Sequence, residues 1–246
     1  MQITYKPAWL LLLALLAVAV RGHAHQPLLI AVDSHSPPFA FENAQRQPQG
    51  IYVGILQAVA QRSGVPLQVR AMPWRRAMQG LDLSQHGVAG LYKNAERAAR
   101  YLYSDPIWQE DVHLFTLPAS SLQAQRAEQL VGTRLGTLAG WYYSDTLQQM
   151  QQRGEVVLET SESDAQNIGK LRARRLDGVL AVKDSVHYLL QHHPRQRQAL
   201  RDGGLVVSNA TYIALPFTPG NVVLMDRINT ALRQMGTARS PATTGR

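Results

Sequence analysis

The chain has 246 residues, a formal net charge of +8 and no cysteine. The absence of cysteine excludes disulfide bonds, thiol chemistry and a lipid anchor on an N-terminal cysteine. No run of lysine and arginine is dense enough to form a nucleic-acid-binding tract, so we expect no nucleic acid as a partner.

The N-terminal segment has the pattern of a secretory signal. Lys6 precedes an apolar run over residues 8–20, which is too short for a membrane span of roughly 18 or more apolar residues. A basic start, a short apolar core and small residues at the end of the segment are typical of an export signal. We therefore expect residues 1–24 to be removed between Ala24 and His25, which leaves a net charge of +6.

Strands and helices alternate in the first part of the remaining chain. A buried-strand pattern at residues 28–32 ends in a loop at residues 33–41. The apolar spacing predicts helices at 50–64 and 74–83, and strands at 65–71 and 88–91. This alternation predicts a layer of parallel α/β structure.

A second α/β unit is expected to begin near Ser120. The pattern predicts strands at 131–137, 156–159 and 178–182, and helices at 141–152, 164–174 and 184–191. Two further strands, at 205–208 and 212–215, carry the chain back to a final amphipathic helix at 221–235.

Residues 87–115 contain the motif that bears most directly on function. An apolar strand contains Gly90, whose missing side chain would let a ligand approach the backbone. A polar turn then leads to Arg97, whose planar guanidinium suits a carboxylate in two parallel hydrogen bonds. Ser104-Asp105-Pro106 and a second β-rich run follow. The alternative is that Arg97 is a solvated surface residue.

This segment resembles the signature of the family 3 periplasmic solute-binding proteins, the polar amino-acid receptors of ABC importers. The resemblance covers nearly all of the chain after the signal. It implies an α/β, two-lobed periplasmic-binding-protein type II fold, in which each lobe is a mixed, mostly parallel sheet flanked by helices. Lobe 1 would comprise residues 25–116 plus 211–246, and lobe 2 residues 117–210. The lobes would close about a hinge near residues 116–121 and 208–211.

The resemblance also implies a ligand site between the lobes, with Arg97 holding a carboxylate. Loop 33–41 would direct Ser36 and Phe39 to the cleft. A core position is the alternative for Phe39 and the expectation for Phe41. The other expected contacts are Trp74 as an aromatic wall, or else a packed lobe corner, with Gly90, Tyr92, the Thr137 hydroxyl and the Leu138 backbone.

The position that binds the ligand's ammonium group in the family departs from the pattern. Val182 occupies that position, and the nearest acid is Asp184, which either replaces the missing carboxylate or caps a helix. Tyr92 and Lys93 likewise replace the hydroxyl residues expected before Arg97. We therefore expect a ligand with a carboxylate or similar anion that need not be an ordinary α-amino acid.

The leading hypothesis is a periplasmic receptor, monomeric and without cofactor or metal, that delivers its ligand to an inner-membrane ABC permease. The absence of a lipid anchor favours a Gram-negative periplasm. His187, His192 and His193 are interpreted as a solvated helix end. One alternative is a dehydratase-like enzyme on the same fold, with Glu42, Glu110 or Asp184 as its acid or base. The other is an accessory or sensory binding protein without its own transporter.

Overall fold

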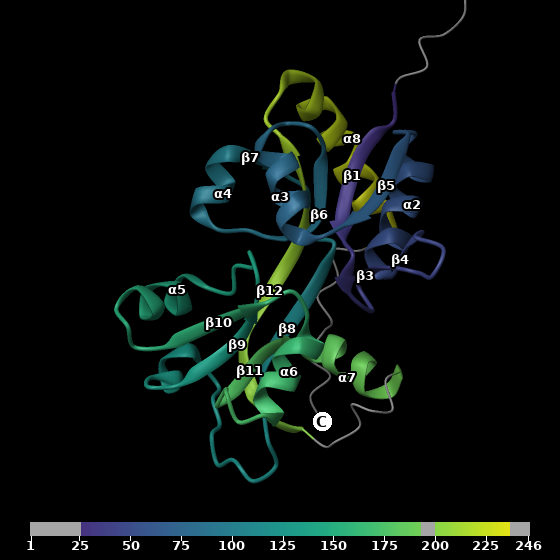
Figure 1. The fold of residues 1–246 in the computed structure, drawn as a ribbon. Helices are drawn as coiled ribbons and strands as arrows, with labels where there is room; N and C mark the ends of the chain where they lie inside the picture. Colours follow the sequence, from purple (N-terminus) through teal and green to yellow (C-terminus); the bar gives the residue numbers. More distant parts are fainter. Residues whose placement is uncertain (1–25, 193–199, 237–246) are drawn as a thin grey trace, which may run out of the picture.

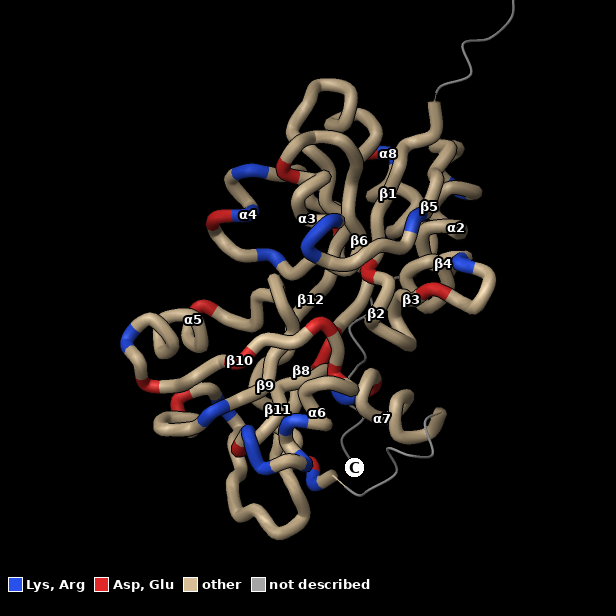
Figure 2. Tube along the Cα trace, in the orientation of Figure 1, with Lys and Arg blue, Asp and Glu red and all other residues tan. Residues whose placement is uncertain are grey.

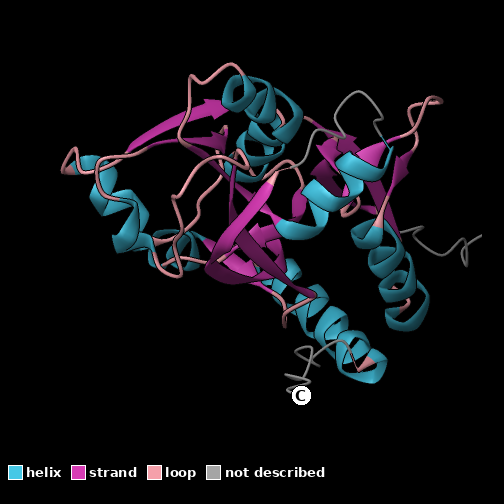
Figure 3. Cartoon of the chain, turned by 90° about the horizontal axis from the view of Figure 1, so that it is seen from below, coloured by secondary structure: helices cyan, strands magenta, loops and turns pink. Residues whose placement is uncertain are grey.

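The computed structural model describes residues 26–192 and 200–236. The expected signal segment and His193 lie outside the described residues. The chain forms two α/β lobes joined by long strands, which confirms the predicted two-lobed fold class (Figure 1). Helices flank the strands of both lobes when the molecule is seen from below (Figure 3).

The upper lobe in Figure 1 is built on a parallel core. β1 (Leu28–Asp33) pairs in parallel with both β5 (Leu67–Met72) and β6 (Gly87–Tyr92). The helices of this lobe are α2 (Ile51–Ser63), α3 (Trp74–Asp82), α4 (Ala95–Arg100) and α8 (Pro219–Met235). A small antiparallel sheet contains β2 (His35–Ser36), β3 (Ala40–Glu42) and β4 (Pro48–Gln49).

The lower lobe repeats this construction with a second parallel core. β9 (Arg134–Leu138) pairs in parallel with β10 (Val157–Ser161) and β11 (Gly178–Val182). Its helices are the 3-10 helix η1 (Ala127–Leu130), α5 (Asp145–Gln152), α6 (Asp164–Arg172) and α7 (Lys183–His192).

Two long antiparallel strands connect the lobes. β8 (Trp108–Thr116) and β12 (Arg201–Pro216) lie side by side, and the sheet order is β10-β9-β11-β8-β12-β6-β1-β5, with β7 (Tyr101–Tyr103) beside β12. The two strands predicted at 205–208 and 212–215 are in fact the single strand β12, because it pairs with β8 in one lobe and with β6 in the other. Residues 112–115 of β8, which were assigned to lobe 1, pair with β11 of the lower lobe. The predicted boundaries between the lobes, at residues 116/117 and 210/211, remain a prediction.

The start of α5 also differs from the sequence-based prediction of residue 141. Ser144 caps the helix, because its Oγ accepts a hydrogen bond from the backbone N–H of Leu147 (3.2 Å). Trp141, Tyr142 and Tyr143 therefore remain in the loop before the helix. This places three aromatic side chains at the junction between the lobes.

Basic and acidic residues are interspersed over both lobes, and the described part of the chain has no single basic tract (Figure 2). Among the residues that the structure describes, no helix has the length and apolar character of a membrane span.

Candidate functional site

The cleft lies where the carboxyl ends of β1 and β6 face the start of α5 and its preceding loop, a common ligand position in α/β folds. The two sides touch in this structure. The Trp74 indole N–H donates a hydrogen bond to the Gly140 carbonyl (3.2 Å). The Arg97 guanidinium lies over the Tyr142 ring at 5.8 Å. Trp74 and Arg97 therefore both lie against the opposite lobe.

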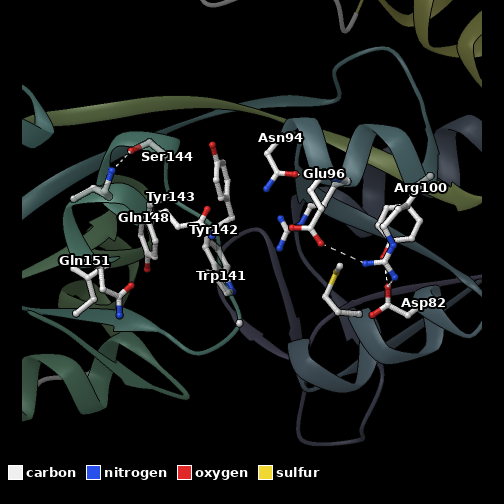
Figure 4. A pocket seen from close by; sticks show the side chains of 16 residues that line it. Asp82, Asn94, Glu96, Arg100, Trp141, Tyr142, Tyr143, Ser144, Gln148 and Gln151 are labelled. Carbon is white, nitrogen blue, oxygen red and sulfur yellow. Dashed lines mark hydrogen bonds and ion pairs between the residues drawn. The ribbon is translucent and has the colours of Figure 1, made fainter. Parts of the chain in front are cut away.

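A cavity of about 410 Å³, here called the α4–α5 pocket, opens between these elements. Its lobe 1 wall includes Asn94, Glu96, Arg97 and Arg100, and its lobe 2 wall includes Trp141, Tyr142, Ser144 and Gln148. Figure 4 shows the labelled side chains of the two walls facing one another. The pocket thus combines aromatic surface with two arginines.

The two arginines of α4 differ in their partners. Arg100 is paired with Asp82 (2.6 Å) and Glu96 (3.6 Å). Arg97 donates to the Tyr92 carbonyl (3.3 Å), and among the described residues no carboxylate lies within 4.0 Å of it. Burial lowers the Arg97 pKa, although an arginine remains charged. Arg97 is therefore the cation of this pocket that has charge to offer an anion.

α4 holds Arg97 in place through its N-terminal cap. The Asn94 side chain accepts a hydrogen bond from the Arg97 backbone N–H (2.8 Å). The helix spans only residues 95–100, so Arg97 lies within one turn of the end of β6. This short connection fixes the guanidinium at the mouth of the cleft.

Trp141 occupies the middle of the cleft. Its ring lies 5.7 Å from that of Tyr92, edge to face, and 6.1 Å from that of Trp74. The buried carboxyl of Asp33, at the end of β1, accepts hydrogen bonds from the His35 backbone N–H (3.0 Å) and from the Trp141 side chain. Burial raises the Asp33 pKa to about 6, and these donors only partly oppose that shift.

Glu110 lies behind the cleft and is only 1% exposed. Its two carboxyl oxygens accept hydrogen bonds from the Tyr52 and Tyr92 hydroxyls. Burial raises the Glu110 pKa to about 7 despite these donors. Because both oxygens are engaged, Glu110 holds Tyr52 and Tyr92 in position and has no free oxygen directed at the cleft.

A second cavity, of about 300 Å³, lies on the other side of the cleft and is here called the β3–α7 pocket. Loop 33–42 forms its lobe 1 wall, and the first turns of α6 and α7 form its lobe 2 wall. Phe41 and Tyr188 face each other there, with ring centroids 6.0 Å apart. Asp164 supplies a carboxyl group to its lining.

Loop 33–41 is placed differently from the expectation. Phe39, expected at the cleft, is fully buried and stacks on Tyr52 at 5.5 Å. Phe41 was expected in the core, but it is half-buried and lines the β3–α7 pocket. Ser36 is also buried, in β2. The sequence identified the loop but not which of its aromatic residues faces the cavity.

The structure explains why position 90 is a glycine, for a reason that the sequence did not indicate. Its φ is +89°, and an added Cβ would lie 2.7 Å from the Tyr52 ring. The Tyr52 ring therefore fills the space beside the Gly90 backbone, where a ligand was expected to approach.

The other residues that were predicted to contact the ligand do not line either pocket. Thr137 is 2% exposed, and the Leu138 N–H donates to the Tyr143 hydroxyl (2.9 Å). Asp184 is exposed in the first turn of α7 and lines neither pocket. Val182 is buried at the end of β11. Their predicted ligand contacts remain predictions.

Asp33, Asp164, Trp141 and Tyr142 were missed as site residues. Asp33 directly follows the strand predicted at 28–32, and Trp141 and Tyr142 directly follow Gly140, so their positions in the sequence offered a signal. Asp164 was interpreted only as part of a helix. Within the part of the chain that the structure describes, no group of three or more His, Cys, Asp or Glu residues is arranged to hold a metal ion.

Comparisons with known proteins agree with this architecture. A family model described as bacterial extracellular solute-binding proteins, family 3, matches residues 28–240. The L-cystine-binding protein TcyJ of Escherichia coli (strain K12) is 24% identical over 155 residues, which cover 62% of this chain and 58% of TcyJ. The match thus spans less than two thirds of that relative.

Two solved structures show the same fold. The holo ArgBP of T. maritima has a TM-score of 0.69 and 20% identity, covering 87% of this chain and 91% of that one. A histidine kinase sensor domain with similarity to periplasmic binding proteins has a TM-score of 0.74 and 19% identity, covering 87% and 93%. Together with the family match, these findings show that the chain belongs to the bacterial extracellular solute-binding proteins, family 3.

Proposed function

We propose that this protein is a periplasmic receptor for a small carboxylate-bearing solute, an amino acid or a related organic anion. The solute binds between the two lobes and is delivered to an inner-membrane ABC permease. The observation that carries the proposal is Arg97, a half-buried guanidinium in the interlobe pocket that no carboxylate of the described residues neutralises. The proposed function is binding without catalysis.

The chemistry of Arg97 supports a carboxylate as the bound group. A guanidinium binds a carboxylate through two parallel hydrogen bonds, and burial strengthens that interaction. The family relative is named for binding L-cystine and the solved relative for binding arginine, which supports an amino acid. Val182 offers no charge to an ammonium group, and the buried Asp33 carboxyl already accepts hydrogen bonds from the His35 backbone N–H and the Trp141 side chain. Amino acids and simple organic anions therefore both belong in the test.

A thermal-shift panel on the purified protein tests the proposal. The panel contains the standard L-amino acids, L-cystine, mono- and dicarboxylates and aromatic acids. A true ligand at 100 times its dissociation constant adds about 2.7 kcal/mol of stability. In a protein of this size that raises the melting temperature by roughly 5–10 °C. A panel in which no solute raises the melting temperature would contradict the proposal.

Substitution of Arg97 by lysine tests the named contact. Lysine keeps the charge but loses the two-pronged geometry, so we expect affinity to fall by about 1.5–3 kcal/mol. Arg233→Lys is the matched control, because Arg233 is paired with Asp105 (2.9 Å) and lines neither pocket, so affinity should change little. Unchanged affinity in Arg97→Lys would show that Arg97 does not hold the ligand.

The import role and the export step have separate tests. Adjacent permease and ATPase genes, together with loss of solute uptake on deletion, would support import over a sensory role. Mass spectrometry of a periplasmic extract should find a mature chain that begins at His25. Retention of residues 1–24 would contradict the export prediction.

A further inference from the structure

The β3–α7 pocket is a separate compartment of the interlobe cleft. It has a volume of about 300 Å³ and shares no lining residue with the α4–α5 pocket that contains Arg97. Phe41, Tyr188 and Leu189 give it apolar walls on both lobes. A cavity of this size with apolar walls and a few polar groups is typical of a small-molecule site.

The pocket contains a carboxyl group that is incompletely hydrogen-bonded. Asp164 lines the cavity, while its Oδ1 is enclosed and has no hydrogen-bond partner. Buried polar atoms are normally paired, so the Asp164 carboxyl group lacks a hydrogen-bond donor that its burial would ordinarily require.

The helix does not supply that donor. Asp164 is the first residue of α6, where free backbone N–H groups could serve a carboxylate. The Gln166 N–H instead donates to the capping Ser163 hydroxyl (3.4 Å). The charge of Asp33, across the cleft, disfavours a second negative charge at Asp164. A bound cation would relieve both the missing donor and the repulsion.

The charged residues that line the pocket indicate whether a cationic or an anionic ligand group binds there. The ionisable residues that line the pocket are Asp164, Glu42, His35 and Tyr188, with no lysine or arginine. This acidic lining is found in a chain with a net charge of +8. An anionic group would meet two carboxyls here, whereas an ammonium group would meet its counter-ion.

We propose that the β3–α7 pocket binds an alkylammonium group, with Asp164 as its counter-ion and its hydrocarbon chain against Phe41, Tyr188 and Leu189. The inference rests on the proposed function, because the amine would belong to a solute enclosed between the lobes. It narrows that solute to the class that carries an amine on an apolar chain.

The pH dependence of amine binding follows from this pairing. Burial, followed by the charge of Asp33, raises the Asp164 pKa to about 7. An amine binds only the ionised carboxylate, so affinity should rise by about thirty-fold from about pH 5.5 to pH 8. Burial also places the pKa of Asp33 at about 6 and that of Glu110 at about 7. The other ionisable groups facing this region are His35, Glu42, Tyr143, Asp184 and Tyr188.

Because several groups titrate together, the assignment needs a variant. Asp164→Asn keeps the size of the side chain and removes its charge. The matched control is Asp145→Asn, since Asp145 is the corresponding first residue of α5 and lines neither pocket. The probe is n-butylammonium chloride, with n-butanol as a neutral probe of similar shape, titrated into ¹⁵N-labelled protein and followed by NMR.

We expect saturable shifts of the Ala165, Ser185 and Tyr188 amide signals with n-butylammonium and much weaker shifts with n-butanol. Asp164→Asn should weaken amine binding at least ten-fold and remove most of its rise with pH, while Asp145→Asn keeps both the affinity and the pH dependence. Equal binding of the two probes, no saturable shift, or an unchanged Asp164→Asn would overturn the proposal.

The probe also separates this inference from the proposed function. n-Butylammonium has no carboxylate, so Arg97→Lys should bind it as the unsubstituted protein does. If carboxylates stabilise the protein but the amine does not bind, the amine pocket is wrong and the receptor role stands. If the amine binds and no member of the solute panel raises the melting temperature, the proposed receptor function is contradicted instead.

Discussion

Two helices of the lower lobe begin with the same dipeptide but place its acid in different surroundings. α5 begins with Ser144-Asp145 and α6 with Ser163-Asp164. Each serine caps its helix through the backbone N–H three residues ahead, at 3.2 Å in α5 and 3.4 Å in α6. Asp145 is exposed and accepts a hydrogen bond from the Tyr142 hydroxyl (2.8 Å). Asp164 lines a pocket and has an enclosed oxygen without a partner.

A capping signal therefore specifies where a helix starts and not the environment of its first acidic residue. A carboxylate in the first turn is ordinarily stabilised by the helix dipole. At Asp164 burial outweighs that effect, because its pKa is raised to about 7. Because α6 packs against residues 33–42, Asp164 is buried and does not act as an ordinary stabilising acid of a first helical turn. Its surroundings suit a ligand instead.

Glu110 differs from both Asp145 and Asp164, because it is buried and both of its carboxyl oxygens accept hydrogen bonds. Replacement by leucine removes the acceptor of two buried tyrosine hydroxyls. We expect Glu110→Leu to lower the free energy of unfolding by about 2–4 kcal/mol, measured by urea denaturation. Glu110→Gln, which keeps an acceptor, should cost less. Equal stability of Glu110→Leu and the unsubstituted protein would mean that the two hydrogen bonds contribute nothing.

Asp164→Asn should have the opposite effect on the protein without ligand. The substitution removes a charge that burial disfavours, so at about pH 8 it should raise the free energy of unfolding by roughly 1–3 kcal/mol. The same variant should bind n-butylammonium more weakly. A destabilised Asp164→Asn at this pH would indicate that the carboxylate already has adequate partners in the folded protein.

The sign of the pH dependence is also fixed by the raised pKa of Asp164. Its carboxyl binds a proton more tightly in the folded than in the unfolded chain, so its contribution lowers stability as pH rises from about 4 to about 7. Chemical denaturation of the unsubstituted protein and Asp164→Asn at several pH values measures this contribution. The difference between the two should grow with pH over that window and stay constant above it.

The sequence predicted the periodic elements well, because burial patterns repeat locally. β11 was predicted over its full extent, and α2 and α6 were predicted to within two residues at each end. The predicted break in β12 was wrong, since a strand that pairs in both lobes has no single burial pattern. The early start predicted for α5 was wrong because the aromatic residues Trp141–Tyr143 were counted as helix although Ser144 caps it.

The site was only partly predictable, because it depends on contacts between distant segments. Arg97 and Trp74 were predicted from motifs, and the structure places both against the opposite lobe, while their ligand contacts remain predictions. The space beside Gly90 is filled by Tyr52, from a helix far earlier in the chain. The burial of Asp164 likewise depends on its tertiary surroundings. No local pattern carries that information.

The two caps should respond alike even though the two acids do not. Ser144→Ala and Ser163→Ala each remove one side-chain acceptor from a helix N-terminus. Each should lower the free energy of unfolding by about 1 kcal/mol. Differential scanning calorimetry of the two variants compares the losses directly. If Ser163→Ala costs far more, Ser163 must contribute to the pocket beyond capping α6.

Asp145→Asn is expected to have the smallest effect and completes the comparison. It removes a charge from the first turn of α5, where the helix dipole favours it, and the amide oxygen of asparagine can still accept the Tyr142 hydroxyl. We expect the free energy of unfolding to fall by about 0.5 kcal/mol, and by less at high salt because the charge is exposed. Urea denaturation at low and high ionic strength measures both values. A stabilised Asp145→Asn would place this acid in the same class as Asp164, and the contrast between the two helix starts would then be lost.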